Sequence, residues 1–349
     1  MPINDRYHRQ RIVDGIGEHG QEAIENSSVA IVGVGALGCM SASMLARAGV
    51  GNITLIDRDI VEGTNLQRQI LFDEEDAISH KPKAIAAAMH LAKINRSINI
   101  TEYVDDLTAL NVERLLQDAD IIVDGLDNFE TRYVLNDFAV QRQKPYMFAG
   151  VIEAKGNVMT VLPKEHESPC LRCIFRDAPS AGSKNTCDTA GVLASAIGIA
   201  SSCQVMDVIK YLTGNKSKIS RTLLTFDLWN TQSNRMKLGK PSPDCPCCGK
   251  SNYEFLDISR GTGAIALCGS NAVQIRGTKS IDLDNIAEKL SEYGTFSVSN
   301  HLVHGTLREE QSEDGDFLEL RCFEDGRVIV HGTDDVGRAK AICSRYVGN

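Results

Sequence analysis

The feature that most constrains this fold is a glycine-rich turn, Gly33-Val34-Gly35-Ala36-Leu37-Gly38, which lies between a β-branched run at 29–32 and a helical stretch at 36–48. A turn in this position leaves backbone N–H groups and the positive end of a helix facing the ligand, an arrangement that favours phosphate. We therefore expect Gly33, Gly35 and Gly38 to bind the phosphates of a nucleotide.

Short β-branched runs alternate with helical stretches from Ser28 onward. This alternation predicts an α/β fold of the Rossmann type, with a mostly parallel sheet and helices on both faces. Strands are predicted at 29–32, 52–56, 98–104, 121–123, 156–162 and 223–227, and helices at 36–48, 83–93 and 192–212. Because 349 residues exceed the usual size of one core, we expect two domains, 1–252 and 253–349.

Residues 253–349 are predicted to form a small α+β domain of unknown role. Strands are expected at 272–275, 296–307, 317–323 and 328–331, and helices at 282–293 and from Asp334. The turn Asp325-Gly326 between two alternating runs is a strong hairpin signal.

An acidic residue, Asp57, follows Gly38 by 19 positions at the end of the second predicted strand. A carboxylate at this position can accept a hydrogen bond from a ribose hydroxyl. The turn and Asp57 taken alone favour an NAD-dependent oxidoreductase. The chain contains no Tyr-x-x-x-Lys pair, however, so that common acid of hydride transfer is missing.

The polar residues that follow Asp57 favour a nucleoside triphosphate instead. They place cations, amides and a second carboxylate where a triphosphate needs neutralisation, at Asp59, Asn65, Arg68, Gln69 and Lys83. Asp127 and Asn128 come directly after the strand at 121–123, and ligands bind at such strand ends in an open parallel sheet. Asp127 is a fitting ligand for Mg²⁺.

At this point the chain resembles the ThiF/MoeB/HesA family, the prokaryotic relatives of ubiquitin-activating enzymes. The resemblance covers roughly residues 5 to 250. It rests on seven ordered motifs: Arg6-Tyr7-His8-Arg9-Gln10, the Gly33 turn, Asn65-Leu66-Gln67-Arg68-Gln69, Lys81-Pro82-Lys83-Ala84, Asp127-Asn128 with Thr131-Arg132, Cys187 before Ala190-Gly191-Val192, and two Cys-x-x-Cys pairs.

The resemblance implies transfer of AMP from Mg·ATP to the C-terminal Gly-Gly carboxylate of a ubiquitin-like sulfur carrier, for thiamin, molybdopterin or related cofactor synthesis. It further implies that Asp57 holds the ribose, that Arg68 and Lys83 bind the phosphates, and that Asp127 binds the metal. The family forms homodimers in which the residue matching Arg9 reaches the phosphates of the neighbouring subunit. A sulfurtransferase or a cysteine desulfurase is a further expected partner.

Four of the eleven cysteines form two Cys-x-x-Cys pairs, Cys170 with Cys173 and Cys245 with Cys248. Four thiolates suit tetrahedral zinc with every coordination position closed. We expect a structural zinc site, in which Cys247 is the spare thiol because it breaks the two-residue spacing.

Cys187 is the one candidate nucleophile. It precedes the small-residue helix predicted from Val192, where a helix N-terminus lowers a thiol pKa. In ThiF-like members this cysteine joins the carrier covalently, whereas in MoeB-like members it is dispensable, so both roles stay open.

Composition narrows the remaining possibilities. A net charge of −9 argues against a nucleic-acid-binding surface. The N-terminal residues lack the apolar segment of a signal peptide, and no apolar run approaches a membrane span, so we expect a cytoplasmic protein without membrane or nucleic-acid partners.

The C-terminal residues depart from the family pattern. Cys322 and Arg327 superficially resemble a rhodanese loop, but they flank the predicted Asp325-Gly326 hairpin, which puts Cys322 in a strand. We reject a rhodanese domain and expect either a module for docking or dimer support or a purely structural one.

Overall fold

The computed structural model describes residues 6–163, 168–176, 190–258, 264–267, 271–277, 280–299 and 301–348. These residues belong to two compact units, the first within 1–258 and the second within 259–349. The domain boundary between residues 252 and 253 stays a prediction.

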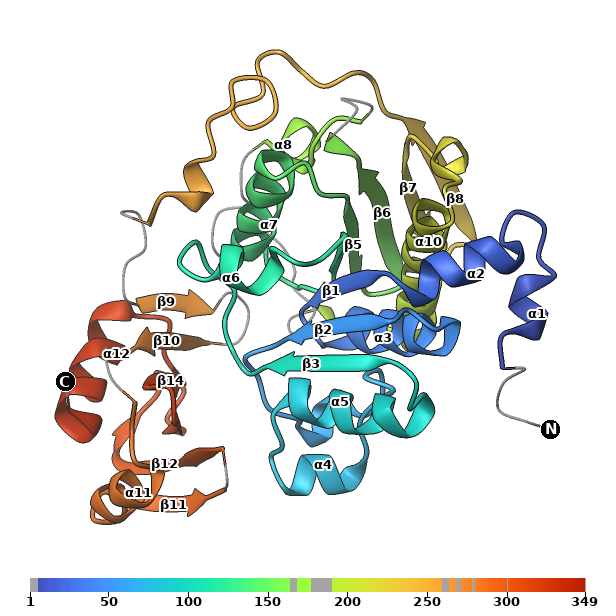
Figure 1. The fold of residues 1–349 in the computed structure, drawn as a ribbon. Coiled ribbons are helices and arrows are strands. Elements are labelled where there is room, and N and C mark those ends of the chain that lie inside the picture. The colour runs from blue at the N-terminus through green and yellow to red at the C-terminus, as the bar shows by residue number, and fades with distance from the viewer. Residues whose placement is uncertain are drawn as a thin grey trace. The chain divides into compact units, whose positions relative to one another are not determined.

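The first unit is built on an eight-stranded sheet with the order β3-β2-β1-β4-β5-β6-β7-β8 (Figure 1). Its strands are β1 (Ser28–Val32), β2 (Asn52–Ile56), β3 (Asn99–Tyr103), β4 (Ile121–Asp124), β5 (Tyr146–Ile152), β6 (Lys155–Val161), β7 (Thr222–Asp227) and β8 (Gln232–Lys237). β1 to β5 pair in parallel, and β5 to β8 pair antiparallel. The chain therefore reverses its direction of travel between β1 and β4, which makes this point a topological switch.

Helices cover both faces of this sheet, because adjacent residues of β1 point into different cores. Val29 and Ile31 pack with α3 (Ala36–Ala48), α5 (Lys83–Ile94) and α10 (Ala194–Leu212). Ala30 and Val32 pack with the other set of helices, α6 (Val112–Leu116) and α7 (Phe129–Gln141). The predicted mostly parallel α/β fold is confirmed.

Shorter elements complete the first unit. They are α1 (His8–Arg11), α2 (Gly17–Glu25), α4 (Glu74–Ile78), α8 (Leu171–Ile174) and the short 3-10 helices at Gly63–Asn65, Lys216–Lys218 and Glu254–Leu256. Among the residues that the structure describes, no helix combines the length and the apolarity needed to cross a membrane.

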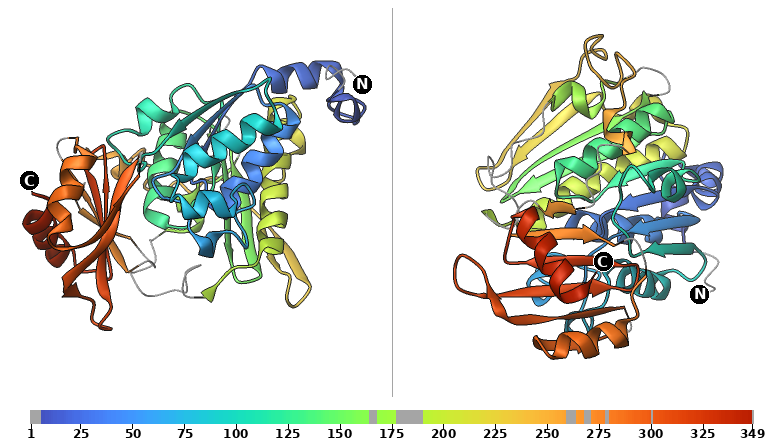
Figure 2. Two further views of the ribbon diagram at one scale, coloured as in Figure 1. Left: turned by 90° about the horizontal axis from the view of Figure 1, so that it is seen from below. Right: turned by 90° about the vertical axis from the view of Figure 1, so that its left-hand side faces the viewer.

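The second unit is an antiparallel sheet of six strands in the order β11-β12-β13-β14-β10-β9, with α11 (Leu283–Ser291) and α12 (Val336–Ile342) on one face (Figure 2). Its strands are β9 (Ala264–Leu267), β10 (Ala272–Arg276), β11 (Gly294–Val298), β12 (Leu302–Gln311), β13 (Phe317–Phe323) and β14 (Arg327–His331), and a π-helical turn follows at Cys343–Val347. Cys322 lies in β13, fully buried opposite Val328, as the hairpin prediction required.

The structure differs from the predicted elements at three strands. The strand predicted at 296–307 is two antiparallel strands, β11 and β12, and between them the Ser299 N–H donates to the carbonyl oxygen of Leu302 at 2.9 Å. β5 was not predicted. β8 was also missed, because all six of its residues are exposed and none forms an apolar pattern.

Candidate active site

The phosphate turn connects β1 to α3 at the carboxyl edge of the sheet. Gly33 has a φ of +85°, and its N–H donates to the carbonyl oxygen of Ile56 at 2.8 Å. A Cβ atom on Gly38 would lie 2.0 Å from the oxygen of Gly33, and one on Gly125 would lie 2.1 Å from the same oxygen. Only glycine permits this close approach of two loops.

The N-terminus of α3 faces this turn. Its N-cap is Gly35, and no side chain of the described residues caps the helix. The first N–H groups of a helix have no partners within the helix, and they favour an anion. The turn can thus hold a phosphate group in the way predicted for Gly33, Gly35 and Gly38.

Asp57 follows β2 and joins the end of that strand to the phosphate turn. Its Oδ2 accepts a hydrogen bond from the Val34 N–H at 2.6 Å, and its Oδ1 accepts from the Asp59 N–H at 2.7 Å. Burial raises the pKa of Asp57 to about 6, although Lys83 opposes this shift. Each oxygen keeps a further lone pair that can accept a ribose hydroxyl.

Lys83 is the first residue of α5 and lies beside Asp57. Its Nζ is 3.2 Å from Oδ2 of Asp59, and its N–H donates to the carbonyl oxygen of Asp59 at 2.9 Å. Burial on its own would lower the pKa of Lys83, but the carboxylates of Asp59 and Asp57 raise it above its ordinary value. The ammonium group is therefore a buried, permanent cation at the predicted phosphate site.

Arg58 is a charged residue of this edge that was not predicted. Its Nη1 bonds to Oδ1 of Asp106 at 3.0 Å, and its Nε lies 3.6 Å from Oδ1 of Asp59. Burial alone would lower the pKa of Arg58, whereas Asp106 and Asp59 raise it. Only its position directly after Asp57 could have indicated Arg58 as a site residue. Its partner Asp106 is 48 residues away in the sequence, so no local motif contains both.

The segment at 63–69 supplies the next predicted residues. Asn65 is buried, and its Oδ1 accepts from the Glu62 N–H at 3.0 Å. Gln69 is also buried, and its Nε2 lies 4.0 Å from the position of a Cβ on Gly35. Gln69 Oε1 has no hydrogen-bond partner among the described residues, which leaves a buried acceptor beside the turn. Arg68 is half-buried and donates to the carbonyl oxygen of Thr64 at 2.9 Å within its own loop.

Asp127 and Asn128 follow β4 at the same edge. Asp127 is exposed, and its Oδ1 accepts from Asn128 Nδ2 at 3.3 Å. Asn128 caps α7, because its Oδ1 accepts from the Thr131 N–H at 2.9 Å. The Asp127 carboxylate lies close enough to raise the pKa values of Lys83 and Arg58. An exposed carboxylate beside a phosphate-binding turn fits a magnesium ligand.

Arg9 lies at the opposite edge of the sheet. Gln10 Nε2 donates to the carbonyl oxygen of Ala48 at 2.9 Å, and Tyr7 is so close to Gly49 that a Cβ there would lie 2.5 Å from its ring. Ala48 and Gly49 come just before β2, so they lie at the amino edge of the parallel sheet. The phosphate turn follows β1, so it lies at the carboxyl edge. Strands of five residues span about 16 Å, so the structure does not bring Arg9 to the phosphate turn of its own chain.

The four predicted zinc ligands come together in the first unit. The sulfur atoms of Cys170, Cys173, Cys245 and Cys248 all lie within 4.8 Å of one another. The shortest distances are 3.4 Å from Cys173 to Cys248 and 3.6 Å from Cys170 to Cys245. Tetrahedral zinc with Zn–S bonds of about 2.3 Å places its sulfur ligands about 3.8 Å apart, so these residues are consistent with zinc. Cys247 is buried beside them and accepts from Asn136 Nδ2 at 3.3 Å.

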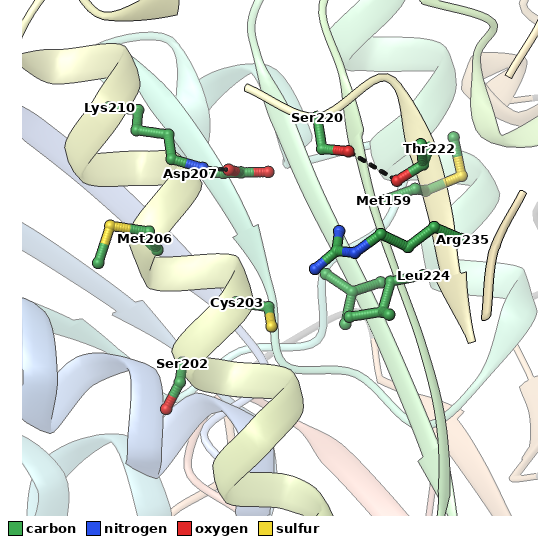
Figure 3. A pocket seen from close by; sticks show the side chains of 11 residues that line it. Met159, Ser202, Cys203, Met206, Asp207, Lys210, Ser220, Thr222, Leu224 and Arg235 are labelled. Atoms are coloured by element: carbon green, nitrogen blue, oxygen red, sulfur yellow. Dashed lines mark hydrogen bonds and ion pairs between the residues drawn. The ribbon is translucent and has the colours of Figure 1, made fainter. Parts of the chain in front are cut away.

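Cys187 lies outside the described residues, so its predicted role as nucleophile stays a prediction. A pocket of about 240 Å³ between α10 and strands β6 to β8 contains another thiol, Cys203 (Figure 3). Four of the polar residues around it pair with each other, Asp207 with Lys210 at 2.8 Å and Ser220 with Thr222 at 2.7 Å. This pocket contains none of the predicted site residues.

A second pocket, of about 360 Å³, lies at the carboxyl edge of the sheet. It is lined by the turn between β5 and β6 at 153–155, by residues 190–193, and by Asp227, Trp229 and Asn230 after β7. Trp229, the one tryptophan of the chain, is 79% exposed. The pocket therefore opens at the same edge of the sheet as the phosphate turn.

Comparison with known proteins agrees with this geometry. The ThiF family model matches residues 7–247. The chain is 40% identical to the sulfur carrier protein ThiS adenylyltransferase of Bacillus subtilis over 349 residues, which cover 99% of this chain and 100% of the relative. It is 35% identical to the sulfur carrier protein adenylyltransferase of Thermus thermophilus over 270 residues, which cover 76% of this chain and 96% of that one.

A third relative is longer. The adenylyltransferase and sulfurtransferase MOCS3 of Culex quinquefasciatus is 37% identical over 244 residues, which cover 70% of this chain but 55% of that protein. Among solved structures, E. coli MccB with ATP superposes with a TM-score of 0.60 at 24% identity, covering 71% of this chain and 75% of that one. That likeness extends to the fold alone.

The family model spans the phosphate turn and three of the four clustered cysteines, and the Bacillus subtilis relative is similar over almost the whole length. The chain therefore belongs to the ThiF family.

Proposed function

We propose that this protein is an ATP-dependent adenylyltransferase that activates the C-terminal Gly-Gly carboxylate of a ubiquitin-like sulfur carrier of the ThiS type. The observation that carries the proposal is the buried Lys83 ammonium, 3.2 Å from Asp59 and beside the turn at Gly33. A triphosphate carries more negative charge than the pyrophosphate of a dinucleotide, and a lysine ammonium stabilises the charge of a phosphoryl group in transfer. The named activities of the Bacillus subtilis and Thermus thermophilus relatives support the same conclusion.

The chemistry suits these residue types. A carboxylate oxygen of the carrier attacks the α-phosphorus of ATP, the bond to the bridging oxygen breaks, and pyrophosphate leaves. The carboxylate is ionised at neutral pH and needs no general base, so catalysis reduces to alignment and neutralisation of charge. Asp57 would hold the ribose, Arg68 and Lys83 the phosphates, and Asp127 a Mg²⁺ ion that supplies further positive charge.

We further propose a homodimer in which Arg9 acts in trans. Arg9 and the phosphate turn of one chain lie at opposite edges of the sheet, so Arg9 can serve a phosphate only in another copy. In a twofold dimer, each copy can place its Arg9 at the phosphate turn of the other copy. The family resemblance points to the same arrangement.

The extended tail of the carrier needs a route to the phosphate turn, and we propose the pocket beside Trp229. This pocket opens at the same edge of the sheet, and Glu153 in its lining bonds through its backbone to Gly191 and Leu193. The exposed indole of Trp229 offers a rigid apolar surface of the kind common in protein recognition. Such a surface tolerates the small residues of a Gly-Gly tail.

Other parts of the chain have separate proposed duties. The cysteine cluster would hold a structural zinc ion, because four thiolates leave no open coordination position. Cys187 would be the acceptor if the carrier forms a covalent intermediate, and a sulfurtransferase or cysteine desulfurase would supply the sulfur. The C-terminal unit would support docking or the dimer, or serve structure alone.

The test is ATP–pyrophosphate exchange with purified small proteins that end in Gly-Gly. We expect exchange that depends on the carrier and its terminal glycines, and a fall of about 10²-fold to 10³-fold in Lys83→Ala and Asp127→Ala. Lys93→Ala, on the exposed side of the same helix α5, is the matched control. Exchange that survives both site substitutions would overturn the residue assignments, and tight NADH binding without ATP binding would overturn the function.

A further inference from the structure

A buried charged network lies directly beneath the loop that carries Asp127. Its centre is Asp124, the last residue of β4, which is fully buried. Oδ2 of Asp124 accepts from Arg132 Nε at 3.1 Å and from the Tyr146 hydroxyl at 2.5 Å, and Oδ1 accepts from the Leu126 N–H at 2.9 Å. Three donors thus fix one carboxylate where the strand ends.

Arg132 connects this carboxylate to the loop. Its Nη2 donates to the carbonyl oxygen of Leu126 at 2.5 Å and to that of Ala149 in β5 at 2.9 Å. The guanidinium also lies over the rings of Phe129 and Phe148, at 5.4 and 5.1 Å from their centroids. A planar group held by two rings and three oxygens has little freedom to move.

The loop at 125–128 is held on both sides of Asp127. Gly125 touches the backbone of Gly33, and both the N–H and the carbonyl group of Leu126 are engaged by the buried network. Asn128 is fixed by its cap on α7. Asp127 is the one exposed residue of this segment, and the other three are half-buried.

We propose that Arg132 is a positioning residue that fixes Asp127 for Mg²⁺ binding, acting through the carbonyl oxygen of Leu126. This inference rests on the proposed adenylyl transfer, and it adds a residue that touches neither nucleotide nor metal. Partners that orient a metal ligand from behind change metal affinity by roughly 10-fold to 100-fold when they are removed.

Tyr146 provides the matched control, because Arg132 and Tyr146 both donate to Oδ2 of Asp124 and only Arg132 also holds Leu126. Arg132→Lys keeps a positive charge beside Asp124, but one ammonium group cannot span the three oxygens that the guanidinium reaches. Tyr146→Phe removes a donor to Asp124 and leaves the contact with Leu126.

The experiment measures the Mg²⁺ concentration that half-saturates ATP–pyrophosphate exchange, and the binding of Mn²⁺ with a non-hydrolysable ATP analogue, in the full-length protein. We expect Arg132→Lys to raise the half-saturating Mg²⁺ concentration about 10-fold and Tyr146→Phe to leave it unchanged. In an Asp127→Asn background, the effect of Arg132→Lys on Mn²⁺ binding is expected to disappear.

Thermal melting shows whether each variant folds. If Arg132→Lys does not fold, the pair Arg132→Gln with Asp124→Asn removes both charges together and avoids an unpaired buried charge. Equal Mg²⁺ dependence of wild type and a folded Arg132 variant would overturn the inference and leave the proposed function intact. A wild-type protein without exchange for any Gly-Gly carrier would instead overturn the proposed function.

Discussion

The backbones of Gly33 and Gly125 are in contact, since a Cβ atom on Gly125 would lie 2.1 Å from the oxygen of Gly33. Gly33 belongs to the phosphate turn and Gly125 to the loop before Asp127. The two loops flank the switch point between β1 and β4, where an open sheet binds its ligand. Phosphate and metal would therefore be held by segments that touch each other.

Gly125→Ala is expected to disturb both loops. The added methyl group must displace the Gly33 carbonyl, so we expect a loss of about 1–3 kcal/mol in the free energy of unfolding and weaker ATP binding. Denaturant unfolding and calorimetric titration with a non-hydrolysable ATP analogue measure the two effects. Gly239→Ala is the control, because no atom lies within 4 Å of a Cβ there. Equal behaviour of the two variants would contradict the close contact.

Asp57 should make stability depend on pH. Burial raises the pKa of Asp57 to about 6, so the folded protein holds this proton more tightly than the unfolded chain. The contribution of Asp57 to stability is then largest below about pH 4 and declines as pH rises through 4 to 6. The stability of wild type relative to Asp57→Asn is expected to fall by on the order of 2–3 kcal/mol across that window.

Urea denaturation at pH 4.5, 5.5 and 7 tests this expectation. The exposed Asp118→Asn serves as the matched comparison. A constant difference in the free energy of unfolding between wild type and Asp57→Asn at all three pH values would show that the folded and unfolded states bind this proton equally.

The cysteine cluster predicts one zinc ion per chain and distinguishes two neighbouring thiols. Cys245→Ser should lose the metal and lower the melting temperature, because three thiolates leave a coordination position open. Cys247→Ser should retain the metal, since its sulfur is not among the four that converge. Zinc content by mass spectrometry decides between them, and loss of zinc in Cys247→Ser alone would reverse the assignment.

Arg9 should complement in trans. Arg9→Ala and Lys83→Ala homodimers are each expected to be inactive, whereas a refolded mixture should regain roughly one quarter of the wild-type sites, because half of the dimers are mixed and each mixed dimer has one intact site. Pyrophosphate exchange reports the recovery. A mixture as inactive as its components would argue that Arg9 does not serve a neighbouring chain.

Trp229 can report on the carrier directly, because it is the one tryptophan of the chain and is 79% exposed. Binding of a carrier tail in the adjacent pocket should shift its emission to shorter wavelength as the indole loses contact with water. A carrier that lacks its two terminal glycines is the control. An unchanged spectrum at saturating carrier would exclude this route for the tail.

The sequence predicted four of the five strands that pair in parallel, β1 to β4, because strands such as β4 are short apolar runs that are fully buried. α3 and β13 begin and end at the predicted residues. The exposed edge strand β8 has no apolar pattern, so its sequence does not predict a strand.

Within the site, Asp57 and Asp127 lie after strand ends at one edge of the sheet and Lys83 begins α5 beside Asp57, whereas Arg9 lies at the opposite edge. The Asp124, Arg132 and Tyr146 network was not predicted as a unit, because its members belong to three elements and only the folded chain joins them. Arg58 was missed for the same reason, since its partner Asp106 follows a different strand.

The hydrogen bond from the Val34 N–H to Asp57 has a further consequence. It joins the end of β2 to the phosphate turn before any nucleotide arrives, so the conformational entropy of ordering this segment is lost when the chain folds. Nucleotide binding then requires less reorganisation of the site. Because the site is rigid, ligands whose sugar and phosphate groups are spaced differently should bind weakly.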